Sequence, residues 1–405
     1  MRPETRLLLL LFGVNLFNYI DRQILYAVFP AVKAELLLTD TQLGLLASGF
    51  MWVYLLTAPI FGLLADRGSR PRLMGLGVGL WSAATAFSGV IGSYGQLLLG
   101  RALVGVGEAS YGSVAPAMLS DAYEPARRGR VLALFSMAIP VGSALGYLLG
   151  GVLERGFGWR AAFFVVGVPG VWLAWRVGRR PDVPRGGGET AAQPGAPRWA
   201  DYLGLLTTRS YVLNCLAMTA MTFAVGGLAA WVPTYLVRVR GMGLAEANLA
   251  FGLLTLVSGL GGTVAGGWLG DRLLARIPAA YFLVSGVGLA LSVPCAAAVI
   301  LLDDRTGVLA AIFLAEVCIF LNTGPLNAIV ANVSRPEVRA TAFAANIFVI
   351  HALGDAISPA IVGFVSDRVG LAAAFWIAPV ALALAALFCF WGMRHFAADA
   401  ARVGA

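Results

Sequence analysis

Apolar stretches of about twenty residues alternate with short polar ones along nearly the whole chain. A helix that crosses a bilayer needs about 20 apolar residues, whereas the strands of a membrane barrel are shorter and strictly alternating. The stretches here are long and do not alternate, so they predict transmembrane α-helices. We expect twelve such helices, at residues 7–30, 43–65, 73–93, 97–120, 131–153, 159–177, 211–237, 247–270, 279–302, 308–332, 340–365 and 371–393.

One long polar stretch, residues 178–210, separates the sixth predicted helix from the seventh. It is rich in Gly, Pro and Arg, a composition typical of a flexible linker. We therefore expect an all-α integral membrane protein. Its two six-helix bundles, residues 1–177 and 211–405, are joined by a cytoplasmic linker.

Composition supports a membrane location. The chain is 59% hydrophobic and 12% charged, whereas soluble domains are about 25% charged. A net charge of +8 is compatible with nucleic-acid binding, but the basic residues lie at helix ends, mostly on one side of the predicted membrane. We therefore expect no nucleic-acid partner. By the positive-inside rule that side is cytoplasmic, which predicts a multi-pass protein of the cell (inner) membrane with both termini in the cytoplasm.

The two halves of the chain share local motifs. Residues 62–70 (GLLADRGSR) at the end of the second predicted helix resemble residues 267–276 (GWLGDRLLAR) at the end of the eighth. Residues 158–163 and 370–375 match at an offset of 212. Two pseudo-symmetric halves around a central site suit alternating access, in which one half rocks against the other.

The segment 62–72 (GLLADRGSRPR) resembles the loop signature of the major facilitator superfamily. Three further runs are similar to the Spinster branch of that superfamily: 100–111 (GRALVGVGEASY), 139–147 (IPVGSALGY) and 351–359 (HALGDAISP). The resemblance implies the major facilitator fold. It also implies a secondary transporter that moves lysophospholipids or sphingosine-phosphate-like lipids.

From this resemblance and the residues we expect a monomeric, proton-coupled transporter of an amphipathic molecule with a charged head. The alternative within the same fold is a proton-coupled transporter of small organic anions or drugs, which several convergent arginines would favour. A receptor or scaffold has no need of the loop signature or of charges inside the membrane. The sequence shows no set of a nucleophile and a base, so we do not expect an enzyme.

The first and fourth predicted helices each carry two charged residues, Asp21 and Arg22 in the first and Arg101 and Glu108 in the fourth. Charges at this depth are costly and are by default functional. Arg101 and Glu108 are seven residues apart and share a helix face. We interpret Glu108 as a proton carrier, since carboxylates in apolar cavities take up protons readily, and Arg101 as its modulator. The alternative is a static ion pair that fixes the fourth helix to the first.

Asp21 and Arg22 are adjacent, so their side chains diverge by about 100° and do not pair with each other. We expect Asp21 to meet Arg101 or another cavity group, and Arg22 to meet an anionic head group. The resemblance to Spinster proteins favours Asp21 as part of the proton-coupling site. The alternative is that the first helix ends early and both charges lie at the outer interface.

The loop signature predicts a gate formed by Asp66, Arg67 and Arg70. The family resemblance implies contacts near a helix N-terminus and across the halves, which stabilise the state closed to the cytoplasm. Asp271 and Arg272 form the second copy, which lacks the Gly-x-Arg that follows in the first. The alternative for both copies is solvated loop charge.

His351 and Asp355 are four residues apart on one helix face. They form either a second titrating pair or a polar contact that orients their helix. Glu316 lies about one turn from position 319, the counterpart of Glu108, and either lines the cavity or bonds to another helix. The expected substrate-binding residues are Arg22, Asn18, Tyr19, Tyr111, Glu316 and Asn322.

Metal and cofactor signatures are lacking in the sequence. The 2 histidines and 4 cysteines show no metal-ligand spacing, and no Gly-rich phosphate loop is present. We expect no metal, no cofactor and no ATP-driven step.

Overall fold

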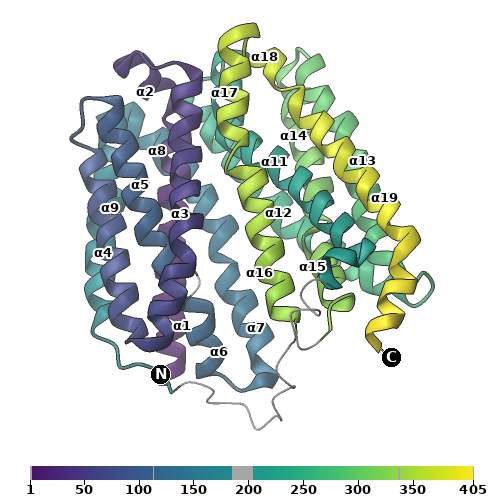
Figure 1. The fold of residues 1–405 in the computed structure, drawn as a ribbon. Coiled ribbons are helices and arrows are strands. Elements are labelled where there is room, and N and C mark those ends of the chain that lie inside the picture. The colour runs from purple at the N-terminus through teal and green to yellow at the C-terminus, as the bar shows by residue number, and fades with distance from the viewer. Residues whose placement is uncertain (1, 113, 185–203, 336–337, 405) are drawn as a thin grey trace. The chain divides into compact units, whose positions relative to one another are not determined.

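The computed structural model describes residues 2–112, 114–184, 204–335 and 338–404, and every regular element within these ranges is a helix (Figure 1). Each of the twelve predicted spans falls on helix. In these ranges, nine helical stretches are long and apolar enough to cross a membrane. The other three predicted spans correspond to α1 (Pro3–Ala27), to α4 (Arg70–Ser88) and to the pair α5 (Tyr94–Gly112) and α6 (Val114–Ala122). The all-α prediction is confirmed.

The chain divides into two compact units. Unit 1 comprises Met1–Ala191 with Ala230–Leu253, and unit 2 comprises Ala192–Ala229 with Leu254–Ala405. The boundaries fall inside α11 (Arg209–Arg238) and α12 (Leu244–Leu274). The end of α11 and the start of α12 therefore pack with the N-terminal helices. Of the predicted linker 178–210, residues 185–203 lie outside the described residues.

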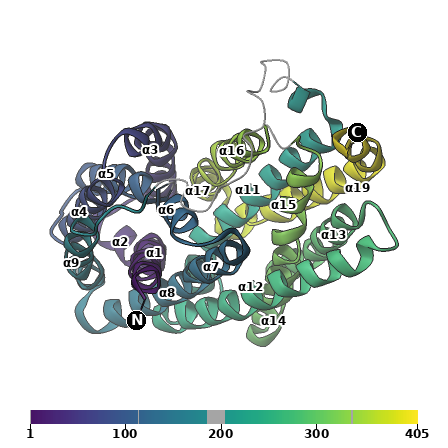
Figure 2. The ribbon, with the colours of Figure 1, turned by 90° about the horizontal axis from the view of Figure 1, so that it is seen from below.

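Unit 1 is a bundle in which neighbouring helices pack in a regular order. In the end-on view of Figure 2, α3, α5, α4 and α9 follow one another along one side, and each contacts the next. Helix α1 packs against α8. In this unit, α3 spans Asp40–Arg67, α8 spans Ala138–Phe157 and α9 spans Trp159–Gly178. Two shorter helices, α2 (Phe29–Leu36) and α7 (Pro125–Ser136), also belong to it.

The contact between α1 and α8 depends on three glycines spaced four residues apart, Gly142, Gly146 and Gly150. A Cβ atom on Gly142 would lie 2.7 Å from the carbonyl oxygen of Leu16, and one on Gly146 would lie 2.7 Å from that of Ile20. Small residues on one face let membrane helices approach closely. This face of α8 therefore holds α1, which carries Asp21 and Arg22.

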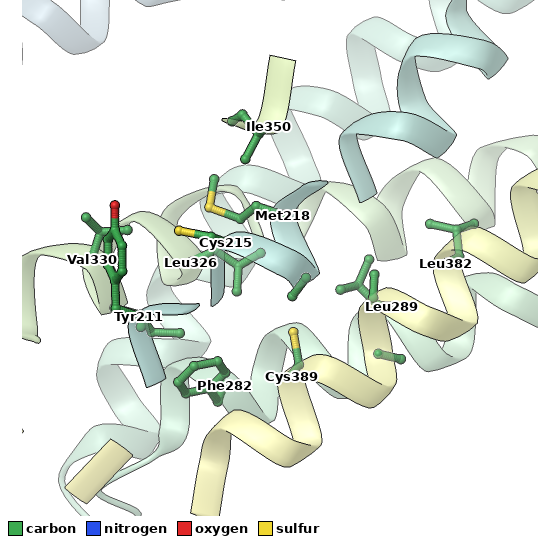
Figure 3. Close-up of a cluster of buried hydrophobic side chains, with 14 of the residues drawn as sticks. Tyr211, Cys215, Met218, Phe282, Leu289, Leu326, Val330, Ile350, Leu382 and Cys389 are labelled. Carbon is green, nitrogen blue, oxygen red and sulfur yellow. The ribbon is translucent and has the colours of Figure 1, made fainter. Parts of the chain in front are cut away.

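Unit 2 has an apolar core in which α11 residues meet α13, α15 and α19. Figure 3 shows part of it, with Tyr211, Cys215 and Met218 of α11 near Leu326 of α15. The described helices of this unit are α13 (Ala280–Leu301), α14 (Arg305–Phe320), α15 (Thr323–Asn332), α16 (Arg339–Ile350), the π-helix η1 (His351–Asp355), α17 (Ser358–Val369), α18 (Leu371–Ala374) and α19 (Ile377–Gly404).

Several predicted spans are interrupted a few residues before a proline. The breaks between α7 and α8, between α14 and α15, and between η1 and α17 precede Pro140, Pro325 and Pro359. Proline removes a backbone donor, and its ring clashes with the carbonyl four residues earlier, so a break at this distance is expected. Broken helices at membrane depth are typical of transporter binding regions.

The internal repeat is visible in the backbone. Gly158 precedes α9 with a φ of 78°, and its counterpart Gly370 precedes α18 with a φ of 87°. Side chains rarely adopt this left-handed region, so both copies need glycine at this turn. The match that the sequence predicts at offset 212 is confirmed at this pair.

Candidate functional site

The four intramembrane charges of unit 1 form one group, which we call the central charge cluster: Asp21 and Arg22 on α1, and Arg101 and Glu108 on α5. Nη2 of Arg101 lies 3.1 Å from Oδ1 of Asp21. The side chains of this pair are 2% and 1% exposed, respectively. The hydroxyl of Thr85 on α4 donates to the other Asp21 oxygen. Contact between Asp21 and Arg101 is therefore confirmed.

The second pair joins Arg22 to Glu108. Nε of Arg22 lies 2.7 Å from Oε2 of Glu108. The Glu108 side chain is fully buried, whereas that of Arg22 is 18% exposed. The two adjacent α1 residues thus pair with two α5 residues that lie two turns apart. Because α1 continues to Ala27, the alternative in which the first helix ends early is wrong.

Aromatic rings surround the Arg22 guanidinium. Its central carbon lies 5.2 Å from the ring centre of Tyr19, 4.9 Å from that of Phe50 and 5.4 Å from that of Tyr54. A cation within about 6 Å of a ring centre is attracted by the ring quadrupole. These rings give the guanidinium apolar neighbours, and the Arg22 side chain remains 18% exposed.

Two polar atoms of the central charge cluster have no hydrogen-bond partner among the described residues. They are Oε1 of Glu108 and Nε of Arg101, and both are buried. A buried acceptor without a donor is destabilising by about 1–3 kcal/mol, and more when the group is charged. The cluster is therefore electrically balanced as two pairs but incompletely bonded, which is a common property of functional sites.

Two predicted substrate-binding residues are buried inside unit 1. Tyr111 is 2% exposed, donates its hydroxyl to the carbonyl of Leu11 and packs edge-on to Trp81 at 5.7 Å. Asn18 is 4% exposed. Tyr19, in contrast, contacts Arg22 directly.

The predicted gate residues differ in their surroundings. Asp66 and Arg67 are exposed at the end of α3, but Arg70 is 5% exposed at the start of α4. Arg70 pairs with Asp121, and its Nε lies 2.9 Å from Oδ1 of Asp182. Arg70 therefore ties together three segments at one end of unit 1, and its described partners all belong to this unit.

The second copy of the gate shows local contacts. The hydroxyl of Tyr281 donates to Oδ1 of Asp271 at 2.9 Å. The Arg272 guanidinium lies 5.3 Å from the Trp268 ring centre.

The remaining predicted polar residues lie in unit 2. Nδ1 of His351 lies 2.9 Å from Oδ1 of Asp355, and this pair spans the π-helix η1, a type of turn found frequently at functional sites. Glu316 contacts two hydroxyls of α12. Asn322 donates to the carbonyl of Ile319 at the break between α14 and α15.

Comparison with known proteins identifies the family. The model described as Major Facilitator Superfamily matches residues 11–358. The Protein spinster of Drosophila melanogaster is 35% identical over 367 residues, which cover 88% of this chain and 61% of that protein. Protein spinster homolog 1 of Homo sapiens is 37% identical over 388 residues, which cover 88% of this chain and 71% of that protein. The chain belongs to the Spinster branch of the major facilitator superfamily.

Solved structures agree on the fold of this Spinster-type chain. A bacterial homolog of the human lysosomal transporter Spinster, in an inward-facing and unoccupied conformation, superposes with a TM-score of 0.89. It is 24% identical and covers 98% of this chain and 99% of its own. A D-xylose–proton symporter, 15% identical, gives a TM-score of 0.75 over 95% of this chain and 96% of its own. These structures show the major facilitator fold, and membership of the family makes the protein a multi-pass membrane transporter.

One charged group that the sequence did not single out lies at the end of unit 1 opposite Arg70. We call it the Asp40 cluster: Lys33, Asp40 and Arg238. Nη1 of Arg238 lies 2.7 and 2.9 Å from the two oxygens of Asp40, and Lys33 pairs with one of them. Asp40 is 1% exposed. The capping box formed by Thr39 and Gln42 was the available sequence signal, because it places Asp40 in the first turn of α3, where the helix dipole favours an acid.

Apolar and polar contacts accompany the Asp40 cluster. Nδ2 of Asn248 donates to the carbonyl of Ala27 at 2.9 Å. The rings of Phe29 and Trp231, both fully buried, lie 5.5 Å apart. The end of α11 and the start of α12 are thus bound to α1, α2 and α3 by an ion pair, a hydrogen bond and an aromatic contact.

A third acid near this end, Glu35 of α2, is bonded to the first residues of α9. Nε1 of Trp159 donates to Oε2 of Glu35 at 2.7 Å, and Arg160 pairs with the other oxygen. These two hydrogen bonds hold the pKa of the Glu35 carboxyl below its usual range. Glu35 therefore remains ionised down to lower pH than a free glutamate.

Proposed function

We propose that this Spinster-type transporter couples proton movement to transport of an amphipathic, lipid-like substrate with a charged head, such as a lysophospholipid or a sphingosine-phosphate-like lipid. Glu108 carries the proton, Arg22 holds the head group, and the Asp21–Arg101 pair fixes α1 to α5 beside them. The alternative substrate class is a small organic anion or drug.

The observation that supports this proposal best is the ion pair between a fully buried acid, Glu108, and a partly exposed base, Arg22. Glu108 is fully buried and bonded through one oxygen to Arg22, while its other oxygen has no partner among the described residues. A proton on that oxygen removes the charge of Glu108 and ends its ionic hold on Arg22. The central charge cluster then carries one net positive charge, on the arginine that is 18% exposed.

This arrangement links the proton to an anionic substrate. An anionic head group and the Glu108 carboxylate compete for the same guanidinium, so protonation of Glu108 strengthens head-group binding. By thermodynamic reciprocity, a bound head group also favours the proton on Glu108. Such linkage is what a coupled transporter needs.

The surroundings of Arg22 favour an amphipathic substrate over a small anion. The neighbours of its guanidinium are the rings of Tyr19, Phe50 and Tyr54. The other arginine of the cluster, Arg101, is 2% exposed and bonded to Asp21. One accessible arginine among aromatic rings suits a single charged head attached to an apolar chain, whereas small polyanions are held by several convergent cations.

Uptake of a labelled lysophospholipid by proteoliposomes tests the proposal. We expect an imposed pH gradient to stimulate uptake by the wild type, measured as lipid that albumin no longer extracts from the outer leaflet. Glu108→Gln should reduce the gradient-stimulated part about tenfold or more, because the amide cannot exchange a proton. Exchange of labelled for unlabelled substrate without a gradient should persist, because the amide mimics the protonated acid.

The matched control is Glu154→Gln, which makes the same change at a partly exposed residue near the end of α8. This control should retain gradient-stimulated uptake. Unchanged stimulation in Glu108→Gln would refute the carrier role. Gradient-driven uptake of a small organic anion, with no movement of lysophospholipid, would refute the lipid assignment and retain the proton site.

The remaining assignments belong to the same proposal. We place the chain as a monomer in the cell (inner) membrane with both termini in the cytoplasm. Asp66 with Arg67 and Arg70, and Asp271 with Arg272, act as the cytoplasmic gate. The pair His351–Asp355 is a secondary polar site, whose position on η1 supports a role in helix movement.

A further inference from the structure

Glu316 of α14 is an intramembrane acid whose hydrogen-bond partners among the described residues are hydroxyl groups. The hydroxyl of Thr255 lies 2.8 Å from Oε1 of Glu316, and that of Ser258 lies 2.8 Å from Oε2. The Ser258 hydroxyl is also 2.7 Å from the carbonyl of Leu254. Glu316 as a residue is partly exposed, whereas the Glu108 side chain is fully buried.

No Arg, Lys or His side chain pairs with Glu316 in the part of the chain that the structure describes. The neighbouring helices explain this. Between Glu246 and Asp271, α12 carries no charged residue. The titratable groups of α13 are Tyr281 and Cys295, and those of α14 besides Glu316 are Arg305 and Cys318. Arg305 is eleven residues from Glu316, about 16 Å along the helix.

The internal repeat shows how this difference between the halves arises. The offset of 205 that relates Asp66 to Asp271 places Thr255 where the first half has Phe50, a ring beside Arg22. The same offset, or the offset of 203 between Pro30 and Pro233, places residues 224–227 where the first half has Asp21 and Arg22. These four residues are Ala, Val, Gly and Gly. The second half therefore carries an acid about one turn from the counterpart of Glu108, has a hydroxyl in place of an aromatic ring, and lacks the base.

A carboxylate at membrane depth without a cation is unfavourable, so the neutral form of Glu316 is favoured when no cation is bound. The hydroxyls are arranged for either state. With a proton on Oε2, Glu316 donates to Ser258, which donates to the Leu254 carbonyl, and Thr255 donates to Oε1. Without the proton, both hydroxyls donate to the carboxylate, and a bound cation supplies the balancing charge.

We propose that Glu316, with Thr255 and Ser258, is a second ionisable site that holds a proton when empty and exchanges it for the ammonium group of a cationic or zwitterionic amphiphile. The exchange is balanced: the O–H bond of the carboxyl group breaks, the proton passes to water, and the carboxylate forms an ion pair with the ammonium. This inference deepens the proposed function and rests on it for the amphiphilic substrate, but it uses a different acid in the other unit.

Calorimetry with decyltrimethylammonium tests the exchange. This probe has a fixed positive charge and no proton of its own, so any proton released on binding comes from the protein. Titrations of the purified full chain in a neutral detergent, in two buffers with different ionisation enthalpies, give the number of protons released. We expect about one proton per bound cation below the pH at which Glu316 ionises, and tighter binding as the pH rises.

Three variants separate the exchange from a structural role. Glu316→Gln should release no proton and bind the cation about tenfold or more weakly, because a charge-assisted contact is lost. Glu316→Asp should retain proton release. Thr255→Val changes the same site but keeps the carboxyl group, so it should also retain proton release. This variant shows whether a loss of release in Glu316→Gln comes from the missing carboxyl group or from misfolding. Decanol, the neutral counterpart of the probe, should show equal affinity for wild type and Glu316→Gln.

The outcomes are distinguishable from those for Glu108. Equal cation affinity and equal proton release in wild type and Glu316→Gln would overturn this inference, while gradient-stimulated uptake that depends on Glu108 would still stand. Proton release that depends on Glu316 supports the inference whether or not Glu108→Gln abolishes gradient-driven uptake. Proton release that vanishes in Glu108→Gln but persists in Glu316→Gln would also overturn it.

Discussion

Replacing Arg101 by leucine is expected to destabilise the protein by about 3–5 kcal/mol, the range observed when one partner of a buried ion pair is removed. Asp21 and Arg101 are 1% and 2% exposed, so neither is compensated by water after the other is lost. The Thr85 hydroxyl would remain as the only described donor to Asp21. The midpoint of thermal unfolding in detergent should fall clearly.

The double variant Asp21→Leu with Arg101→Leu decides whether the loss comes from the unpaired charge. Apolar residues of similar volume often replace a buried pair without loss, so the double variant should recover most of the stability while gradient-driven uptake stays impaired. The control is the exposed ion pair between Arg160 and Glu35. The Arg160 side chain is 33% exposed, so Arg160→Leu should lower the free energy of unfolding by about 1 kcal/mol or less. Equal unfolding midpoints for wild type and Arg101→Leu would contradict the prediction.

The sequence was sufficient to predict the fold and the helices that carry the buried charges. A run of about twenty apolar residues has few alternatives to a membrane helix, because the backbone must satisfy its own hydrogen bonds in lipid. The repeated glycines were equally readable, since Gly158 and Gly370 both adopt positive φ. These features depend on the chemistry of residues that are consecutive in the sequence.

The ion pairs within the central charge cluster could be predicted only in part from the sequence. Helix spacing gives the direction of a side chain but not its reach or its partner on another helix. The contact of Asp21 with Arg101 was expected, whereas the 2.7 Å contact of Arg22 with Glu108 was not. Arg22 reaches Glu108 because the two helices hold these faces together, and this depends on packing between residues 86 positions apart.

The Asp40 cluster was missed for a related reason. Lys33, Asp40 and Arg238 lie at predicted helix ends, where charged residues are ordinary and solvated. Only the packed structure shows that Asp40 is 1% exposed and that its partner is 198 residues away. Charge at a helix end therefore gave no signal of burial.

The Asp40 cluster leads to the second large effect. An alternating-access cycle requires that contacts which close one end of the protein break when that end opens. Both Asp40 oxygens bond to Arg238, so α3 and the end of α11 are held together at this point. Asp40 is buried, but Lys33 and Arg238 are 30% and 34% exposed. The contact should therefore contribute about 1–3 kcal/mol, between the values of surface and buried pairs.

Asp40→Ala is accordingly expected to raise the population in which α11 has moved away from α3 by about 5-fold to 150-fold, since tenfold corresponds to about 1.4 kcal/mol. Spin labels at Leu37, which is 87% exposed, and at the exposed Gly243, in a chain with its four cysteines replaced by alanine, report the separation as a distance distribution. A longer distance should appear in the variant. The exchanged pair Asp40→Arg with Arg238→Asp should restore part of the short distance, because it rebuilds one ion pair with reversed polarity, although Lys33 then faces a like charge. An unchanged distribution in Asp40→Ala would show that the aromatic contact of Phe29 with Trp231 and the Asn248 hydrogen bond hold this end closed without the charges.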